Sequence, residues 1–363
     1  MSKKFNPLKV SIYYGSCGMP LNLDTYRYCP FQCEYCFMKN RVIGKRNNNK
    51  IPNIHQLKYK FKKIYDDKNI DYTNFLEVLL KNRIDLHCGT KTECFQPIEE
   101  KMQYTKQAVD ICNEYDQHIV FTTKADTYYN VNVNPDNHSF QLSITHTYND
   151  RYLEPFAPAF EKRLDFYRQL KDEGFKVGIR IEPTIPNVSD IENIISYFED
   201  ADHFHFAKLT LSNQLKYPEL IKYIKCTKND FIMRGKQVVK DEVFYNQIKN
   251  AADYLDENGY SWSTRFIHLG SDKCCCGDTL VKNPTTFNSL ALKNKYGKSW
   301  TLNDALSELG EYKNCKCDYL YTSNNQNGLK TVEEYYKDRF NKPLTRYNPN
   351  KQFIPYTTLM DFY

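Results

Sequence analysis

The sequence predicts an α/β protein, a partial (β/α)6-type TIM-like barrel followed by an irregular, cysteine-containing C-terminal extension. Three observations support this prediction. Short apolar runs rich in β-branched residues alternate with amphipathic helical patterns over residues 1–270. The 363 residues are enough for one large domain with an appendage. Beyond Gly270 the alternation stops, so we expect residues 271–363 to form a separate C-terminal region.

Seven segments have the composition of buried parallel strands. They cover residues 21–26, 83–88, 118–123, 140–145, 176–182, 204–211 and 262–269. Helical patterns occupy residues 160–170, 191–198 and 242–255, and Gly174 is placed to end the first of these helices. Six or seven parallel strands with crossover helices make an open or partial barrel, and we expect the chemistry at the C-terminal ends of its strands.

Composition argues against a membrane or an exported protein. The mean hydropathy is −0.69, and no segment approaches the ~18 apolar residues that a membrane helix needs. The basic segment at residues 1–10 lacks the apolar stretch of a secretory signal. We therefore expect a cytoplasmic protein without a membrane partner. A net charge of +6 permits a nucleic-acid partner without requiring one.

The 13 cysteines are clustered, and in a reducing cytosol they are better explained as metal ligands or free thiols than as disulfides. Cys29, Cys33 and Cys36 follow a C-x3-C-x2-C spacing. No second cysteine pair follows at the distance usual for structural zinc sites. Three thiolates from one loop suit a four-iron cluster with one iron left open for a non-protein ligand. A partial zinc site or three incidental thiols are the alternatives.

This spacing, with the aromatic Tyr35 directly before the last cysteine, resembles the signature of radical SAM enzymes. The segments Phe121-Thr-Thr-Lys124, Phe140-Gln-Leu-Ser143, Glu154-Pro155 and Glu182-Pro-Thr-Ile-Pro186 follow in the order of the spore-photoproduct-lyase-like branch. The resemblance covers about residues 20–187. It implies a partial-barrel enzyme that binds S-adenosylmethionine at the open iron of a 4Fe-4S cluster. Reductive cleavage of this cofactor would yield a 5′-deoxyadenosyl radical that takes a hydrogen atom from the substrate.

The resemblance also implies roles for individual residues. Cys29, Cys33 and Cys36 would hold the cluster. The other cofactor contacts would be Tyr35 beside the adenine, Lys124 and Ser143 at the methionine and ribose, and Gly89 and Thr90 at a close approach of the backbone. A lysine can pair with a carboxylate and a serine hydroxyl can bond a ribose hydroxyl, although a surface lysine and an ordinary strand serine would look the same.

Four further residues on predicted strands have two interpretations each. Arg180 and Glu182 share one face of a strand and would bind the cofactor or form a structural ion pair. His203 and His205 also share a face, and we favour solvent-facing or hydrogen-bonded histidines over a zinc site.

Cysteines outside the first cluster are candidates for two other roles. The photoproduct lyase uses a cysteine as hydrogen donor, which makes Cys88 and Cys94 the candidate catalytic residues, with buried structural thiols as the alternative. The C-terminal region could hold a second 4Fe-4S cluster or a zinc ion, against free thiols. Its candidate ligands are Cys274, Cys276, Cys315 and Cys317.

The sequence therefore predicts a radical SAM enzyme acting on nucleic acid, in DNA lesion repair as a lyase or in base modification. The basic loop of residues 39–50, with Arg41, Lys45 and Arg46, could bind phosphates. A flavodoxin- or ferredoxin-like protein would supply the electron. The alternative substrate is a peptide, protein or small metabolite, which the C-terminal cysteines favour. A zinc-stabilised nucleic-acid-binding module is the non-enzymatic alternative.

Overall fold

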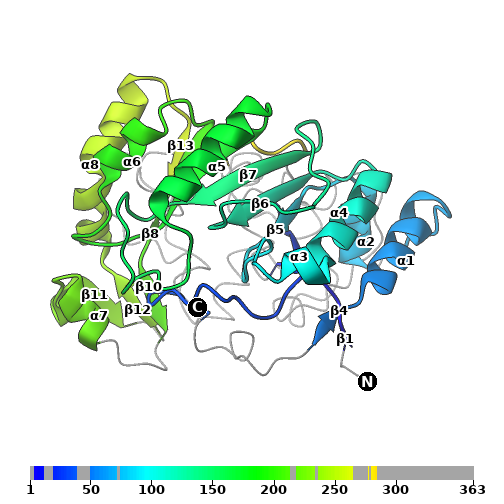
Figure 1. The fold of residues 1–363 in the computed structure, drawn as a ribbon, viewed down its shortest axis with the longest axis horizontal. Helices are drawn as coiled ribbons and strands as arrows, with labels where there is room; N and C mark the ends of the chain where they lie inside the picture. The colour runs from blue at the N-terminus through cyan, green and yellow to red at the C-terminus, as the bar shows by residue number, and fades with distance from the viewer. Residues whose placement is uncertain are drawn as a thin grey trace, which may run out of the picture.

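The computed structural model describes residues 4–11, 19–38, 50–71, 74–212, 218–233, 236–264, 277 and 279–283. Its main feature is an eight-stranded sheet in the order β13-β9-β8-β7-β6-β5-β3-β2 (Figure 1). All neighbouring strands are parallel except β2 and β3. The strands are β2 (Leu8–Val10), β3 (Leu21–Leu23), β5 (Leu86–Cys88), β6 (Ile119–Thr123), β7 (His138–Ser143), β8 (Lys176–Thr184), β9 (His203–Lys208) and β13 (Trp262–Thr264).

This sheet confirms the predicted α/β fold and partial barrel. Within the described residues, its edge strands β2 and β13 do not pair with each other, so the sheet curves without closing. All seven predicted strands are present, most of them shorter than expected. The segment predicted as one strand at residues 204–211 divides into β9 and β10 (Thr210–Ser212). Of the segment predicted at 262–269, the structure describes residues 262–264.

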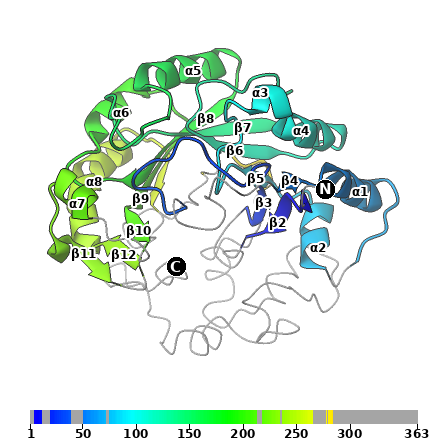
Figure 2. The ribbon, with the colours of Figure 1, turned by 60° about the horizontal axis from the view of Figure 1, so that its bottom comes forward.

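Helices cover the convex outer side of the curved sheet, as Figure 2 shows for α3 to α6 and α8. The helices are α1 (Ile54–Tyr65), α2 (Phe75–Lys81), α3 (Glu99–Met102), α4 (Tyr104–Glu114), α5 (Phe160–Asp172), α6 (Ile191–Tyr197), α7 (Pro218–Tyr223) and α8 (Asp241–Glu257). In the part of the chain that the structure describes, none of these helices has the length and apolar character to cross a membrane.

Two small sheets flank the large one. The parallel pair consists of β1 (Lys4–Phe5) and β4 (Ile51–Pro52). The antiparallel sheet has the order β10-β12-β11, with β11 (Phe231–Met233) and β12 (Lys236–Val239), and it follows directly on β9.

Helix α5 illustrates how the sequence positions an element. Its predicted apolar stripe, Phe160, Leu164, Tyr167 and Leu170, is buried. The helix ends where predicted, because Gly174 takes a left-handed conformation with φ +87° and its amide bonds to Lys171 O.

The two faces of the large sheet differ in polarity. Toward the helices, the ring of Phe140 lies 5.3 Å from that of Phe121, 6.1 Å from Phe166 on α5 and 5.1 Å from Phe175, measured between centroids. The opposite, inner face carries buried polar side chains on six neighbouring strands. These are His87, Gln141, Arg180, His205 and Ser263, together with the half-buried Thr122 on β6.

Residues 279–283 pack against the sheet at the N-terminal ends of its strands. The amides of Lys282 and Asn283 donate to the buried carboxylate of Asp85, which precedes β5, at 2.6 and 3.1 Å. Leu280 O accepts from Ser139 Oγ at 2.6 Å, and its side chain is buried against Gly178. The described part of the predicted C-terminal region thus lies against the barrel.

A histidine at the start of β7 predicts a pH dependence of stability. Burial and the nearby His118 lower the pKa of His138 from 6.5 to about 3. The unfolded chain therefore binds a proton below pH 6.5 that the folded chain does not, and stability falls as the pH decreases from 6.5 toward 3. We expect His138→Gln to reduce this slope by up to about 1.4 kcal/mol per pH unit. Urea unfolding of the wild-type apo-protein and of His138→Gln at pH 7.5, 6 and 5 measures the slope of the unfolding free energy against pH. Equal slopes for the two proteins would contradict the prediction.

Candidate cofactor site

The three clustered cysteines lie on the loop that follows β3, at the C-terminal end of the sheet. Cys33 is buried, and Cys29 and Cys36 are partly exposed. Burial, followed by the nearby Glu93 carboxylate, raises the pKa of Cys29 to about 12. Burial and Glu154 likewise raise the pKa of Cys33. Such thiols become ligands only when a bound cation stabilises the thiolate form.

Three thiols on one loop are a donor set that iron–sulfur clusters use. Among the described residues, no three His, Cys, Asp or Glu side chains converge closely enough to hold one metal ion. A zinc ion would draw its sulfur ligands to about 2.3 Å from a single point. Thiolates of an iron–sulfur cluster bind different irons and therefore stand farther apart. Cys29, Cys33 and Cys36 are near enough to shift one another's pKa.

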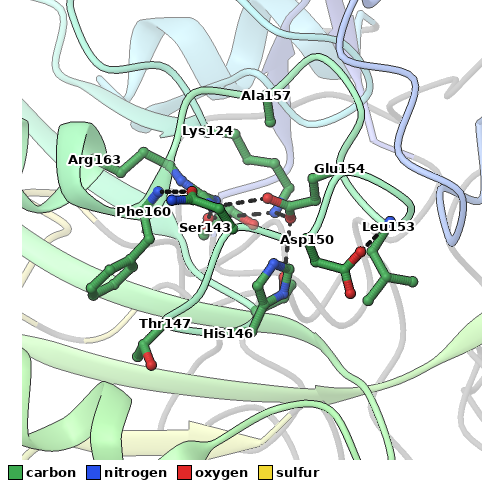
Figure 3. A network of polar contacts seen from close by, with 12 residues as sticks. Lys124, Ser143, His146, Thr147, Asp150, Leu153, Glu154, Ala157, Phe160 and Arg163 are labelled. Carbon is green, nitrogen blue, oxygen red and sulfur yellow. Dashed lines mark hydrogen bonds and ion pairs between the residues drawn. The ribbon is translucent and has the colours of Figure 1, made fainter.

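A buried carboxylate, Glu154, lies beside the cysteine loop in a network of polar contacts (Figure 3). Its carboxylate oxygens pair with Lys124 Nζ and Arg163 Nη2, both at 2.9 Å. It also accepts hydrogen bonds from Thr145 Oγ1 at 3.0 Å and from the Tyr35 hydroxyl. Burial alone would raise the pKa of Glu154, but Arg163 and Lys124 hold it well below its usual range. Glu154 is therefore a charged group in the interior.

The network brings together three of the residues predicted to bind the cofactor. Lys124 follows β6 and Ser143 ends β7, and Lys124 Nζ lies 3.4 Å from Ser143 O. The same ammonium group stands 5.5 Å from the centre of the Tyr35 ring. Arg163 Nη1 donates to Ser143 O at 3.1 Å from α5. Lys124 is thus a partly buried, paired lysine and not a solvated surface residue.

The segment after β5 holds the backbone of Lys124 through Glu93. Glu93 is buried, and it accepts hydrogen bonds from Thr123 Oγ1 at 2.6 Å and from the amides of Lys124 and Phe95 at 2.9 and 3.0 Å. Burial raises the pKa of Glu93.

Gly89 has φ +89°, and a Cβ there would collide with Thr122 O, so the position requires glycine.

The remaining predicted cofactor ligands have protein partners. Arg180 pairs with Glu182, and its Nη1 donates to Gln141 Oε1 at 2.9 Å. Ser143 Oγ reaches Glu182 O at 3.5 Å, which connects this pair to the Lys124 side of the site. Thr90 Oγ1 donates to Asp24 at 3.3 Å. The ion pair is the structural alternative that the sequence left open, and cofactor contacts of Arg180, Glu182 and Thr90 stay predictions.

The two strand histidines are hydrogen-bonded within the sheet, as we favoured, but they are buried and not solvent-facing. His203 Nε2 and His205 Nδ1 lie 2.8 and 3.0 Å from Ser263 Oγ. His203 Nδ1 also contacts Ser261 Oγ at 2.9 Å.

Cys88 and Cys94 are both buried in the apolar core. Cys88 lies on β5, and its strand neighbour His87 is on the polar face, so the Cys88 thiol points to the helix side of the sheet. There, after burial, it contributes to the raised pKa of Cys112 on α4. Burial, followed by the nearby Cys88, raises the pKa of Cys94. Such surroundings are those of buried structural thiols, the alternative that the sequence analysis gave for both residues. A role of either thiol as hydrogen donor stays a prediction.

Several predicted residues lie outside the described residues. These are the candidate ligands of a second metal site, Cys274, Cys276, Cys315 and Cys317, and the basic residues Arg41, Lys45 and Arg46. The second 4Fe-4S cluster or zinc ion stays a prediction.

Sequence reasoning gave no role to Glu93, Thr145, Glu154 or Arg163. Glu154-Pro155 was part of the family resemblance, and Arg163 interrupts an otherwise apolar helix face. A charged residue on a buried face needs a buried partner of opposite charge, and this was the available signal.

Comparison with known proteins supports the fold. No protein-family model matches the chain. An uncharacterized protein of Methanocaldococcus jannaschii is 23% identical over 247 residues, which cover 61% of this chain and 83% of that protein. A mutant of spore photoproduct lyase superposes with a TM-score of 0.52 at 16% identity, covering 68% of this chain and 76% of the lyase. A double mutant with bound AdoMet and dinucleoside spore photoproduct gives 0.51 at 15% identity, over 71% and 79%.

The chain therefore has the fold of spore photoproduct lyase. The resemblance that the sequence predicted, to the lyase-like branch of the radical SAM superfamily, is confirmed at the level of the fold.

The hydrogen bonds of Glu93 lead to a prediction for the apo-protein. In Glu93→Gln, one side-chain oxygen becomes an amide that cannot accept from a backbone amide or a hydroxyl. A buried donor then loses its partner, and we expect a loss of about 1–3 kcal/mol in the free energy of unfolding. Chemical denaturation measures this change. The exposed Glu100→Gln on the same segment is the control, and equal midpoints for both variants would contradict the prediction.

Proposed function

We propose that this protein is a radical SAM enzyme with a 4Fe-4S cluster on Cys29, Cys33 and Cys36. The proposal rests above all on one observation. A loop with three cysteine thiols is joined, through Tyr35 and Glu154, to Lys124 and Ser143 at the C-terminal ends of parallel strands. In barrels of this kind the chemistry occurs at that edge of the sheet. The likeness to a fold that binds AdoMet in spore photoproduct lyase supports it.

Bound there, the cluster supplies the electron that splits S-adenosylmethionine into methionine and a 5′-deoxyadenosyl radical. The residues of this chain bind and orient the cofactor. Lys124 has the charge to pair with its carboxylate, and Ser143 and Glu182 can hydrogen-bond its hydroxyl groups. The polar inner face, with Gln141 and Arg180, offers donors and acceptors to a substrate.

We infer that the substrate is a nucleic acid, with lesion repair by a lyase reaction or base modification as the outcome. The support is the lyase-like fold, the net charge of +6 and the basic loop of residues 39–50. A cytoplasmic location and a flavodoxin- or ferredoxin-like electron donor belong to this proposal.

Iron content tests the cluster. After anaerobic reconstitution, we expect Cys29/Cys33/Cys36→Ala to bind about four fewer irons per chain than the wild type, as one cubane holds. It should also lose the 5′-deoxyadenosine that the wild type forms from S-adenosylmethionine and dithionite. Cys226→Ser, a change in a cysteine remote from the loop, should retain both. Irons that survive in the triple variant would indicate the second cluster, whereas no iron in any of the proteins would refute the proposal.

Salt-dependent binding tests the substrate class. We expect Arg41/Lys45/Arg46→Ala to weaken binding to single- and double-stranded DNA and to reduce the slope of log K against log salt, by about 0.7–0.9 per lost phosphate contact. Fluorescence anisotropy at 50–200 mM salt measures both quantities. The control Lys101/Arg168/Lys249→Ala removes the same charge from exposed positions elsewhere. Identical curves for the two triple variants, or no binding at 50 mM salt, would favour a peptide or small-metabolite substrate.

A further inference from the structure

Glu154 contacts four segments of the candidate site. Its partners come from the cysteine loop (Tyr35), the segments that follow β6 (Lys124) and β7 (Thr145), and α5 (Arg163). These elements are far apart in the sequence, and their side chains point toward Glu154 in Figure 3 where they are labelled.

The two cations of this network differ in exposure. The side chain of Arg163 is 3% exposed and is fixed by a second hydrogen bond to Ser143 O. Lys124 is 14% exposed and has a flexible stem. Within this network one carboxylate faces two positive charges, which leaves Lys124 able to pair with a further anion. Lys124 is the cation whose position allows it to meet such an anion at the end of the sheet.

The cysteine loop is fastened at two points to the segment that carries Glu154. Tyr35, between Cys33 and Cys36, donates its hydroxyl to Glu154. The amide of Glu34 donates to Leu153 O at 2.9 Å, one residue before Glu154. Asp150 holds this segment in turn, because its carboxylate accepts from the Leu153 amide at 2.9 Å. A displacement of the cysteine loop therefore moves Glu154, and with it Lys124.

We propose that Glu154 is a positioning residue that couples the cysteine loop to the binding of the cofactor carboxylate by Lys124. This inference rests on the proposed function and deepens it. Glu154 does not touch the reacting atoms. It fixes the Lys124 ammonium group and the Tyr35 ring relative to each other, so that a correctly placed loop also presents a correctly placed cation.

The test compares two buried glutamates in the reconstituted full-length protein. Glu154→Gln keeps the shape of the side chain but removes the charge that holds Lys124, and we expect the Kd for S-adenosylmethionine to rise about ten-fold or more. Glu99→Gln is the matched control, because Glu99 is equally buried and also accepts from a tyrosine hydroxyl, that of Tyr26. Affinity is measured at equal iron content, together with the change that the cofactor causes in the EPR spectrum of the reduced cluster.

A second variant keeps the inference testable if Glu154→Gln fails to fold. Tyr35→Phe removes one hydroxyl and leaves both ion pairs of Glu154 in place. We expect it to retain iron and the melting temperature of the apo-protein but to weaken cofactor binding several-fold and alter the EPR response. A merely structural role would lower the melting temperature without either change.

Two outcomes separate failure of this inference from failure of the proposed function. If the wild type binds iron and the cofactor, and Tyr35→Phe and any folded Glu154→Gln bind the cofactor as tightly as Glu99→Gln, the coupling is refuted and the function stands. If the wild type binds neither iron nor the cofactor, the proposed function itself is wrong.

Discussion

A negative charge inside a protein is stable only when opposite charges and hydrogen-bond donors surround it. Glu154 meets this condition with Lys124, Arg163, Thr145 and Tyr35, each from a different segment. The requirement works in both directions, because loss of the carboxylate would leave two cations facing each other. The loop of residues 146–159, α5 and the cysteine loop are thus held in one arrangement by electrostatics, where apolar packing alone would allow them to shift.

The same reasoning explains the contrast between the two faces of the sheet. Phe121 and Phe140 fill the space under the helices and give the sheet its stability. On the inner face, Gln141 and Arg180 satisfy each other, and His203 and His205 share the hydroxyl of Ser263. A polar interior of this kind costs stability unless its groups are paired, and it is retained where a ligand has to be recognised.

Much of this fold could be predicted from the sequence because parallel strands buried on both sides produce continuous apolar runs. The segments that became β6, β7 and β8 were found for that reason, and Gly174 ended α5 as a glycine C-cap does. The cysteine spacing likewise directed attention to the correct loop. Local patterns could not predict the network of Glu154, since its contact with Tyr35 joins residues 119 positions apart. Arg163 was given no role because its apolar neighbours dominate the helical periodicity.

The contacts of residues 279–283 have a consequence for how the protein is made. Asp85 is completely buried, and two of its donors are the amides of Lys282 and Asn283. While a ribosome has produced only the strands up to β9, that carboxylate and the surface around Gly178 remain open to water. The sheet is completed at this end only when a segment almost two hundred residues later in the chain arrives. A fragment cut at residue 270 would therefore carry an exposed edge that invites association with other nascent chains.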